Sequence, residues 1–192
     1  MCGCVLDLLV AAFVRQGNVS TLAGDPEPGY VDGVGRDARF NNPSGVAVDR
    51  NRNVYVADER NHRIRMVTPQ GVVTTVAGSG ATGDNGGGFQ DGDALTEARF
   101  SSPSSIALYY DWTLGDGPAG LVILVSDTNN HKIRRIHNGT VTTLAGGDRG
   151  LADGWGVGAR FDTPHGIAVT HSGVIFVADT LNFLIRKITP DG

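Results

Sequence analysis

Three aspartates and three asparagines recur at one spacing and are the first candidates for chemistry. Each asparagine follows its aspartate by three positions, in the pairs Asp58 and Asn61, Asp127 and Asn130, and Asp179 and Asn182. A ring of carboxylates could bind a metal ion or act in general acid–base catalysis. A catalytic site needs carboxylates in different roles, however, and a residue that recurs unchanged is explained more simply as structural. We expect each aspartate to accept backbone N–H bonds and to close the connection that follows it.

His165 is the second candidate, because it stands outside the repeated pattern. The matching positions of the other copies carry Ser44 and Ser104. A neutral imidazole binds Zn²⁺, but a zinc site needs three protein ligands even when it is catalytic. With serine at both other positions, we expect a hydrogen-bonded His165, no metal and no cofactor.

Other motifs of catalysis are absent from the sequence. It has no Gly-x-Ser-x-Gly nucleophile elbow, no phosphate-binding loop and no His-Glu-x-x-His pair. We therefore expect no catalytic residues and a chain that is not an enzyme. The net charge of −4, from 16 basic and 20 acidic residues, gives no basic stripe for nucleic acid.

The longest apolar stretch covers residues 5–14 and contains Asp7. It is about half of the ~20 residues that a membrane helix needs, so we expect no membrane span. It is also a poor signal peptide, because no Lys or Arg precedes it. The cytoplasm is then the default compartment, and an extracellular location is the alternative.

An internal repeat must position the candidate residues. Three copies share an Ala-Arg-Phe triplet, a short apolar run that ends in Asp, and an Asn-x-x-Ile-Arg segment. The first two copies continue to Thr-Thr-Val-Ala-Gly or Thr-Thr-Leu-Ala-Gly, and a partial copy, residues 19–24, precedes them. In the first copy, β-branched residues predict strands at 45–49, 54–58, 63–68 and 72–77. Antiparallel units of four strands at this spacing are typical of an all-β fold, the β-propeller.

The repeated residues also resemble a known family. Val-Thr-Thr-Val-Ala-Gly, Ala-Arg-Phe-Asn-x-Pro-x-Gly-Val-Ala-Val-Asp, Val-Tyr-Val-Ala-Asp and Asn-His-Arg-Ile-Arg resemble the consensus of NHL-repeat propellers. The resemblance extends over residues 19–192. It implies blades of four antiparallel strands, in proteins that include protein-interaction modules, RNA-binding modules and metal-dependent lyases. The run Pro-His-Gly-Ile at His165 is similar to a ligand position of propeller lyases.

The repeat divides the chain into blades at about residues 25–78, 79–146 and 147–192, with residues 19–24 as a leading outer strand and 1–18 outside the repeat. These strands make three blades, whereas a closed ring needs at least four. We expect a partial propeller, a fragment of a six-bladed one. The alternative is a homodimer in which the leading strand of each chain completes the last blade of the other.

Two further sets of repeated residues carry structural expectations. Phe40, Phe100 and Phe161 each end an Ala-Arg-Phe triplet shortly before Pro, and we expect them to be buried between blades. Arg65, Arg134 and Arg186 alternate with apolar residues of the third strand, and we expect them on the surface of the blade. The second copy also carries an inserted segment, 109–120, whose aromatic residues either contact a partner or fold back onto their own blade.

The expected functional surface lies where the second and third strands of each blade connect. These connections share one face with the connections between blades, and unrepeated residues there would set specificity. They are Glu59, Arg60, Thr128, Asn129, Thr180, Leu181 and His165. We expect a non-enzymatic scaffold that binds a protein partner across this face. The alternatives are a metal-dependent lyase or lactonase and, less favoured by the charge, an RNA-binding module.

Overall fold

The structure is a computed structural model that describes residues 17–80, 82–83, 86–115 and 117–190. These residues form β-strands and short 3-10 helices, and no α-helix occurs among them. The N-terminal segment expected at 1–18 lies outside the described residues, apart from residues 17 and 18.

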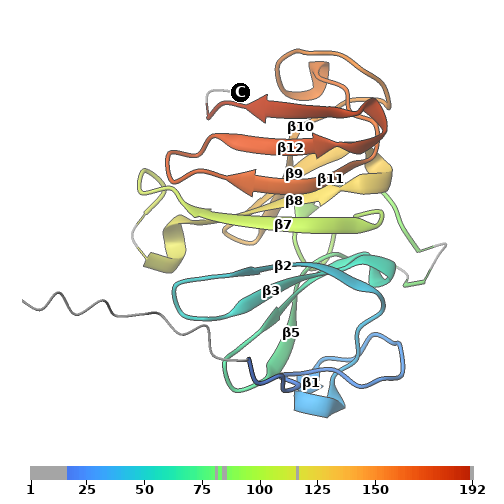
Figure 1. Ribbon diagram of the computed structural model, residues 1–192, viewed down its shortest axis with the longest axis vertical. Helices are drawn as coiled ribbons and strands as arrows, with labels where there is room; N and C mark the ends of the chain where they lie inside the picture. Colours follow the sequence, from blue (N-terminus) through green and yellow to red (C-terminus); the bar gives the residue numbers. More distant parts are fainter. Residues whose placement is uncertain (1–16, 81, 84–85, 116, 191–192) are drawn as a thin grey trace, which may run out of the picture.

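The strands form three antiparallel sheets, one for each copy of the repeat (Figure 1). The first has the order β1-β5-β4-β3-β2, with bounds Gly33–Val34, Val72–Ala77, Arg63–Val67, Val54–Asp58 and Pro43–Val48. The second has the order β6-β10-β9-β8-β7, with bounds Gly92–Asp93, Thr140–Ala145, Lys132–His137, Leu121–Asp127 and Pro103–Tyr110. The third has the order β11-β12-β13, with bounds Pro164–Val169, Ile175–Asp179 and Leu184–Ile188.

Six short 3-10 helices connect the strands within the described residues. They are η1 Gly35–Asp37, η2 Glu59–Asn61, η3 Gly117–Gly120, η4 Thr128–Asn130, η5 Gly156–Gly158 and η6 Thr180–Asn182.

The three sheets are the blades of a partial β-propeller. Their inner strands lie side by side, because β7 contacts both β2 and β11. The approach is close: a Cβ atom on Gly45 of β2 would lie 2.6 Å from the carbonyl oxygen of Ser104 in β7. The all-β propeller fold that the repeat predicts is confirmed.

Two details of the strands differ from the sequence prediction. The short outer strands β1 and β6, which pair with β5 and β10, were not predicted. Residues 19–24 were predicted as a leading outer strand but do not form one. A strand requires a neighbour for its N–H and C=O groups, and no strand pairs with this segment among the described residues.

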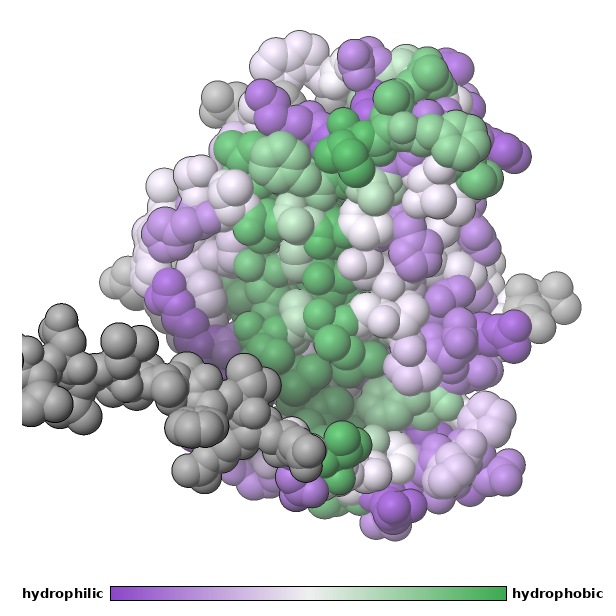
Figure 2. All heavy atoms as spheres, in the orientation of Figure 1, coloured by the Kyte–Doolittle hydropathy of each residue, from purple (hydrophilic) through white to green (hydrophobic). Residues whose placement is uncertain are grey.

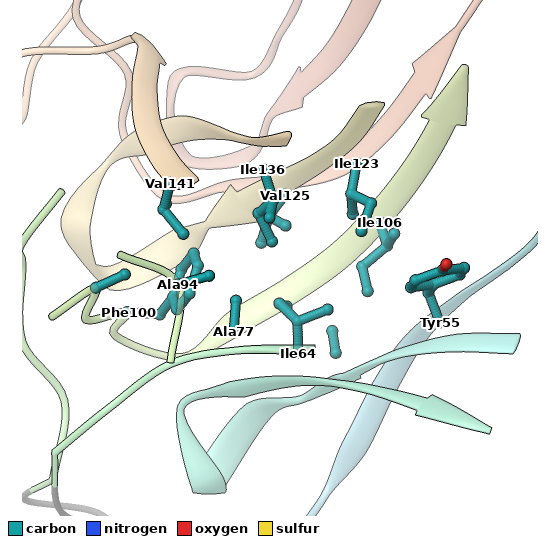
Figure 3. Close-up of a cluster of buried hydrophobic side chains, with 12 residues drawn as sticks. Tyr55, Ile64, Ala77, Ala94, Phe100, Ile106, Ile123, Val125, Ile136 and Val141 are labelled. Carbon is teal, nitrogen blue, oxygen red and sulfur yellow. The ribbon is translucent and has the colours of Figure 1, made fainter. Parts of the chain in front are cut away.

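The blades hold together through apolar side chains packed between them. One cluster joins the first two blades, with Tyr55 and Ile64 on one side and Ile106, Ile123 and Phe100 on the other (Figure 3). A second cluster joins the second and third blades. Hydrophobic residues also remain at the surface, where they form a band across the face seen in Figure 2.

The expected burial of the repeated phenylalanines is confirmed for two of the three. Phe100 and Phe161 are each 1% exposed. The expectation is wrong for Phe40, which is half-buried. Phe40 packs against the apolar cluster of its own blade, and no described blade covers it from the other side.

The surface position expected for the repeated arginines is wrong. The side chains of Arg65 and Arg134 are 0% exposed and that of Arg186 is 9% exposed. Each guanidinium lies over a repeated phenylalanine ring, at 5.1, 5.0 and 5.1 Å from the ring centre. The alternation of residues along the third strand shows on which side of the blade the arginines lie. The segment between blades covers that side, so the arginines are buried and not at the surface. Carbonyl groups of this segment accept hydrogen bonds from each arginine.

Each buried arginine pairs with the repeated aspartate of its own blade. The Nη1 atoms of Arg65, Arg134 and Arg186 lie 2.7, 2.6 and 2.8 Å from Oδ2 of Asp58, Asp127 and Asp179. The aspartates also accept hydrogen bonds from the side chains of Asn61, Asn130 and Asn182. Their Oδ1 atoms accept the backbone N–H of Asn41, Ser101 and Asp162. The structural role expected for the aspartates agrees with these contacts.

Burial changes the protonation of these aspartates. It raises the pKa of Asp127 to about 6, while Arg134, Asn130 and the Ser101 N–H act in the opposite direction. Burial likewise raises the pKa of Asp58. A carboxyl whose pKa rises on folding keeps its proton in the native state where the unfolded chain has lost it. Its stabilising contribution is therefore complete below the ordinary value of 3.8 and is lost as the pH rises through 6.

We predict that Phe100→Ala lowers the free energy of unfolding by about 3–5 kcal/mol, because it leaves a cavity between two blades. The matched variant Phe40→Ala should lower it by only about 1–2 kcal/mol, because Phe40 is already half exposed. Urea unfolding followed by circular dichroism measures both values. Equal losses would contradict the packing between blades.

We predict that Arg134→Met lowers the free energy of unfolding by about 3–5 kcal/mol at pH 7.5, because it leaves the Asp127 carboxylate buried without its cation. Without Arg134 the pKa of Asp127 rises further, so the loss should be smaller at pH 5, where the carboxyl is protonated. Urea unfolding at the two pH values measures the difference.

The control is Arg149→Met. Arg149 pairs with Asp162 at 2.9 Å, but its side chain is 64% exposed, so the loss should be at most about 1 kcal/mol. A loss for Arg134→Met that is as small, or that grows toward low pH, would be incompatible with the buried ion pair.

Candidate functional site

The connections between the second and third strands gather at one end of the blades, as expected. The inner strands begin at the same end, because Pro43, Pro103 and Pro164 pair with the aspartates that close the second strands. The fold therefore brings most of the expected functional residues to one surface. We call this surface the loop face and define it as Glu59, Arg60, Asn129, Thr180, Leu181 and His165.

Each connection of the loop face is a 3-10 turn held in one shape. The turns η2, η4 and η6 end at His62, His131 and Phe183, which adopt the left-handed conformation with φ of 55, 56 and 60°. The middle N–H of each turn donates to a carbonyl of the segment between blades, at 3.1, 3.1 and 3.0 Å. The buried aspartate lies just before the turn. These contacts fix the backbone, so the exposed side chains are presented from rigid loops.

The side chains of the loop face are exposed and chemically mixed. Arg60, Asn129, Thr180, Leu181 and His165 are exposed, and Glu59 is half-buried. Glu59 accepts a hydrogen bond from the Nδ2 of Asn42 at 3.1 Å, and Asn129 donates to the hydroxyl of Ser102 at 2.9 Å. Leu181 adds an apolar side chain that is 48% exposed.

Thr128 departs from the expectation that it lies on the functional surface. It is 6% exposed, and its hydroxyl donates to the Pro164 carbonyl at 2.8 Å and shares a hydrogen bond with Ser104 at 2.6 Å. Thr128 therefore ties the second blade to the inner strand of the third. Its counterpart Thr180 stays exposed, because no described blade follows the third.

His165 lies exposed at the second residue of β11. Ser44 occupies the matching place in β2, where its hydroxyl donates to the Ser104 carbonyl at 2.9 Å. No group of three or more His, Cys, Asp or Glu residues in the described part of the chain could hold a metal ion. The ligands that a zinc site at His165 would need are not gathered around it.

Two other histidines connect neighbouring blades beside the loop face. The Nδ1 of His62 accepts the Ser102 N–H, and the Nδ1 of His131 accepts the Thr163 N–H, each at 3.0 Å. An imidazole that accepts at Nδ1 must be neutral and carry its proton on Nε2, and burial lowers the pKa of His131. Each of these histidines therefore reaches from its own blade to the next.

The aromatic residues of the inserted segment in the second blade lie against the first blade. Tyr110 and Trp112 stack with ring centres 6.0 Å apart, and Arg50 of the first blade lies over both rings at 4.2 and 4.7 Å. Trp112 remains 49% exposed. It borders a hollow of about 440 Å³ at the end of the blades opposite the loop face. The aromatic residues thus contact the neighbouring first blade, not only their own.

Comparison with curated proteins points to one family. The NHL repeat pattern matches residues 40–65. NHL repeat-containing protein 2 of Bos taurus is 37% identical over 116 residues, which are 59% of this chain and 14% of that protein. Protein SUPPRESSOR OF QUENCHING 1, chloroplastic, of Arabidopsis thaliana is 34% identical over 191 residues, which are 96% of this chain and 16% of that protein. This chain thus spans less than a fifth of either relative.

Comparison with solved structures supports the same fold. An auxiliary nutrient binding protein from Bacteroides ovatus matches with a TM-score of 0.69 at 24% identity, over 81% of this chain and 39% of that one. At this identity the likeness shows the fold alone. No helix among the described residues is long and apolar enough to cross a membrane. The sequence pattern, the relatives and the blades agree, and the chain belongs to the NHL-repeat propellers.

Proposed function

We propose that this chain is a non-enzymatic scaffold that binds a protein partner across the loop face. The observation that carries the proposal is the difference in burial between the repeated residues, which hold the blades together, and the residues of the loop face. The repeated aspartates and arginines are buried below the loops, whereas most of the residues that differ between blades are exposed above them. Because the repeated residues hold the loops, the side chains of the loop face can differ between blades without any change of fold.

The chemistry of the loop face supports a protein partner. It offers a guanidinium, a carboxylate, an amide, a hydroxyl, an imidazole and a leucine side chain, a mixture of polar and apolar groups that is typical of non-obligate protein interfaces. The turns are held by backbone hydrogen bonds, so binding would lose little conformational entropy.

The two alternative functions receive less support. A lyase or lactonase would need metal ligands from several blades, and the described residues do not gather them around His165. An RNA-binding face would be basic. Here Glu59 lies beside Arg60, and Arg149 pairs with Asp162, so the two signs of charge alternate. A homodimer would use the strand edges and leave the loop face open.

We predict that a photo-crosslinking amino acid at position 129 captures a protein in an extract of the organism that makes this chain. The matched control places the same amino acid at Asn51, an exposed residue of the β2–β3 connection at the opposite end. The partner identified by mass spectrometry should be captured only from position 129. The purified partner should bind Leu181→Asp at least about 10-fold more weakly than the unchanged chain, because a charge replaces an apolar contact.

Three results would contradict the proposal. These are equal capture from both positions, RNA as the molecule captured from position 129, and one tightly held metal ion per chain that is lost in His165→Ala. Elemental analysis of the purified chain tests the last of them.

A further inference from the structure

A hollow between the second and third blades has no part in the proposed function. Its volume is about 440 Å³, which is within the range of about 300–1,000 Å³ that is usual for small-molecule sites. It lies at the end of the blades opposite the loop face, where β7 connects to β8 and β11 connects to β12. Its lining includes Tyr109, Tyr110, Trp112, His171, Ser172 and Gly173.

The inserted segment makes one wall of this hollow, although the blade fold does not require it. The β2–β3 and β11–β12 connections each take five residues, 49–53 and 170–174, whereas the β7–β8 connection takes ten, 111–120. The segment also keeps a large aromatic ring at the surface, because Trp112 is 49% exposed. A loop that the other blades lack, with a tryptophan left open to solvent, is better explained by binding than by stability.

The aromatic rings of this wall are held in place without a ligand. The Tyr110 hydroxyl accepts the backbone N–H of Arg50 at 3.3 Å. The Arg50 guanidinium lies 4.2 Å from the centre of the Tyr110 ring and 4.7 Å from that of the Trp112 ring. Asp111, which lies between the two in the sequence, accepts the N–H and hydroxyl of Thr113 at 3.0 and 2.5 Å. Binding to such a wall loses little conformational entropy.

Polar groups surround the rings in the hollow. Both bonds of Asp111 use Oδ1, so Oδ2 can accept a hydrogen bond from a ligand. The third blade adds the imidazole of His171 and the hydroxyl of Ser172, and both residues are exposed. The Ser172 hydroxyl shares a hydrogen bond with that of Thr170 at 3.0 Å. The hollow thus combines aromatic surface with groups that bond hydroxyls.

The charges at the hollow favour a neutral ligand. The hydrogen bond from the Thr113 hydroxyl lowers the pKa of Asp111, so this carboxylate is ionised at neutral pH and repels an anion. Arg135 acts on the same carboxylate, and Arg50 lies over the rings, so a cation is repelled as well. A wholly apolar ligand would remove the carboxylate from water without a hydrogen bond, which is unfavourable.

We propose that this hollow binds a pyranose unit of a neutral carbohydrate. A pyranose carries C–H groups on the faces of its ring and hydroxyls around its rim. The C–H groups pack on the aromatic rings of Tyr110 and Trp112, and the hydroxyls bond the Asp111 carboxylate and the polar groups of the third blade. The loop face takes no part in this binding, so this proposal and the proposed partner binding can fail separately.

Tryptophan fluorescence of the full chain tests the proposal, because the chain has two tryptophans, Trp112 and Trp155. In the variant Trp155→Phe, all tryptophan emission comes from Trp112. Titration with maltotriose, cellotriose, mannotriose and N-acetylated chitotriose should give a saturable change for at least one of these neutral sugars. The control is Trp112→Phe, which retains Trp155. That residue is 70% exposed and does not line the hollow, so its emission should stay constant.

Calorimetry with the sugar that binds tests the individual contacts. Trp112→Ala should weaken binding at least about 10-fold, because the ring that stacks on the sugar is lost. Leu114→Ala is the matched control: Leu114 belongs to the same segment and is 39% exposed, but it does not line the hollow, so binding should not change. Trigalacturonic acid should bind more weakly than the neutral sugar, because Asp111 repels its carboxylates. Circular dichroism checks that each variant keeps its strands.

Three results would overturn the proposal. These are no saturable change of the Trp112 emission with any of the four sugars, equal affinities of Trp112→Ala and Leu114→Ala, and tighter binding of trigalacturonic acid or adenosine than of the neutral sugar. The same sugar linked to a carrier protein distinguishes two sources of the ligand. Binding to the linked form indicates the glycan of a glycoprotein, and binding to the free form alone indicates a free saccharide; either result supports the site.

Discussion

The buried pair of arginine and aspartate in each blade is the interaction on which the rest of the structure depends. Asp127 closes the second strand, Arg134 lies on the third, and the segment before the blade supplies Ser101 and the carbonyl groups that complete both. A buried charge without its partner is strongly unfavourable, so each group requires the other. The pair therefore holds together two strands and a distant segment. Phe100, which lies below Arg134, belongs to the apolar cluster between the first two blades.

This arrangement separates the residues that hold the fold from the residues that can vary. The aspartate and asparagine fix each turn from below, and the backbone N–H of the turn fixes it from the side. Apart from the buried Thr128 and the half-buried Glu59, the other side chains of the turns are exposed and make none of these contacts. A carboxylate in one blade, an amide in the next and a leucine in the third thus share one surface without disturbing the strands below them.

Each blade depends on its neighbours for burial. In the middle blade, Leu124 and Val125 point to opposite sides of β8, and both are 0% exposed. In the third blade Phe176, the counterpart of Leu124, is 40% exposed, and Val46 on the inner strand of the first blade is 63% exposed. Stability in such a fold comes largely from contacts between neighbouring units.

The sequence by itself determined the repeat, the all-β propeller, the bounds of most strands and the end of the blades where the variable residues gather. These features follow from local alternation and from turn residues that recur in register. Only the tertiary structure decided which exposed-looking residues are buried. Arg65 is covered by carbonyls 26 and 34 positions earlier in the chain, Thr128 by a strand 36 positions later, and Phe40 is left half open. Alternation reports the side of a strand on which a residue lies, but burial depends on what covers that side, and here the cover comes from distant segments and neighbouring blades.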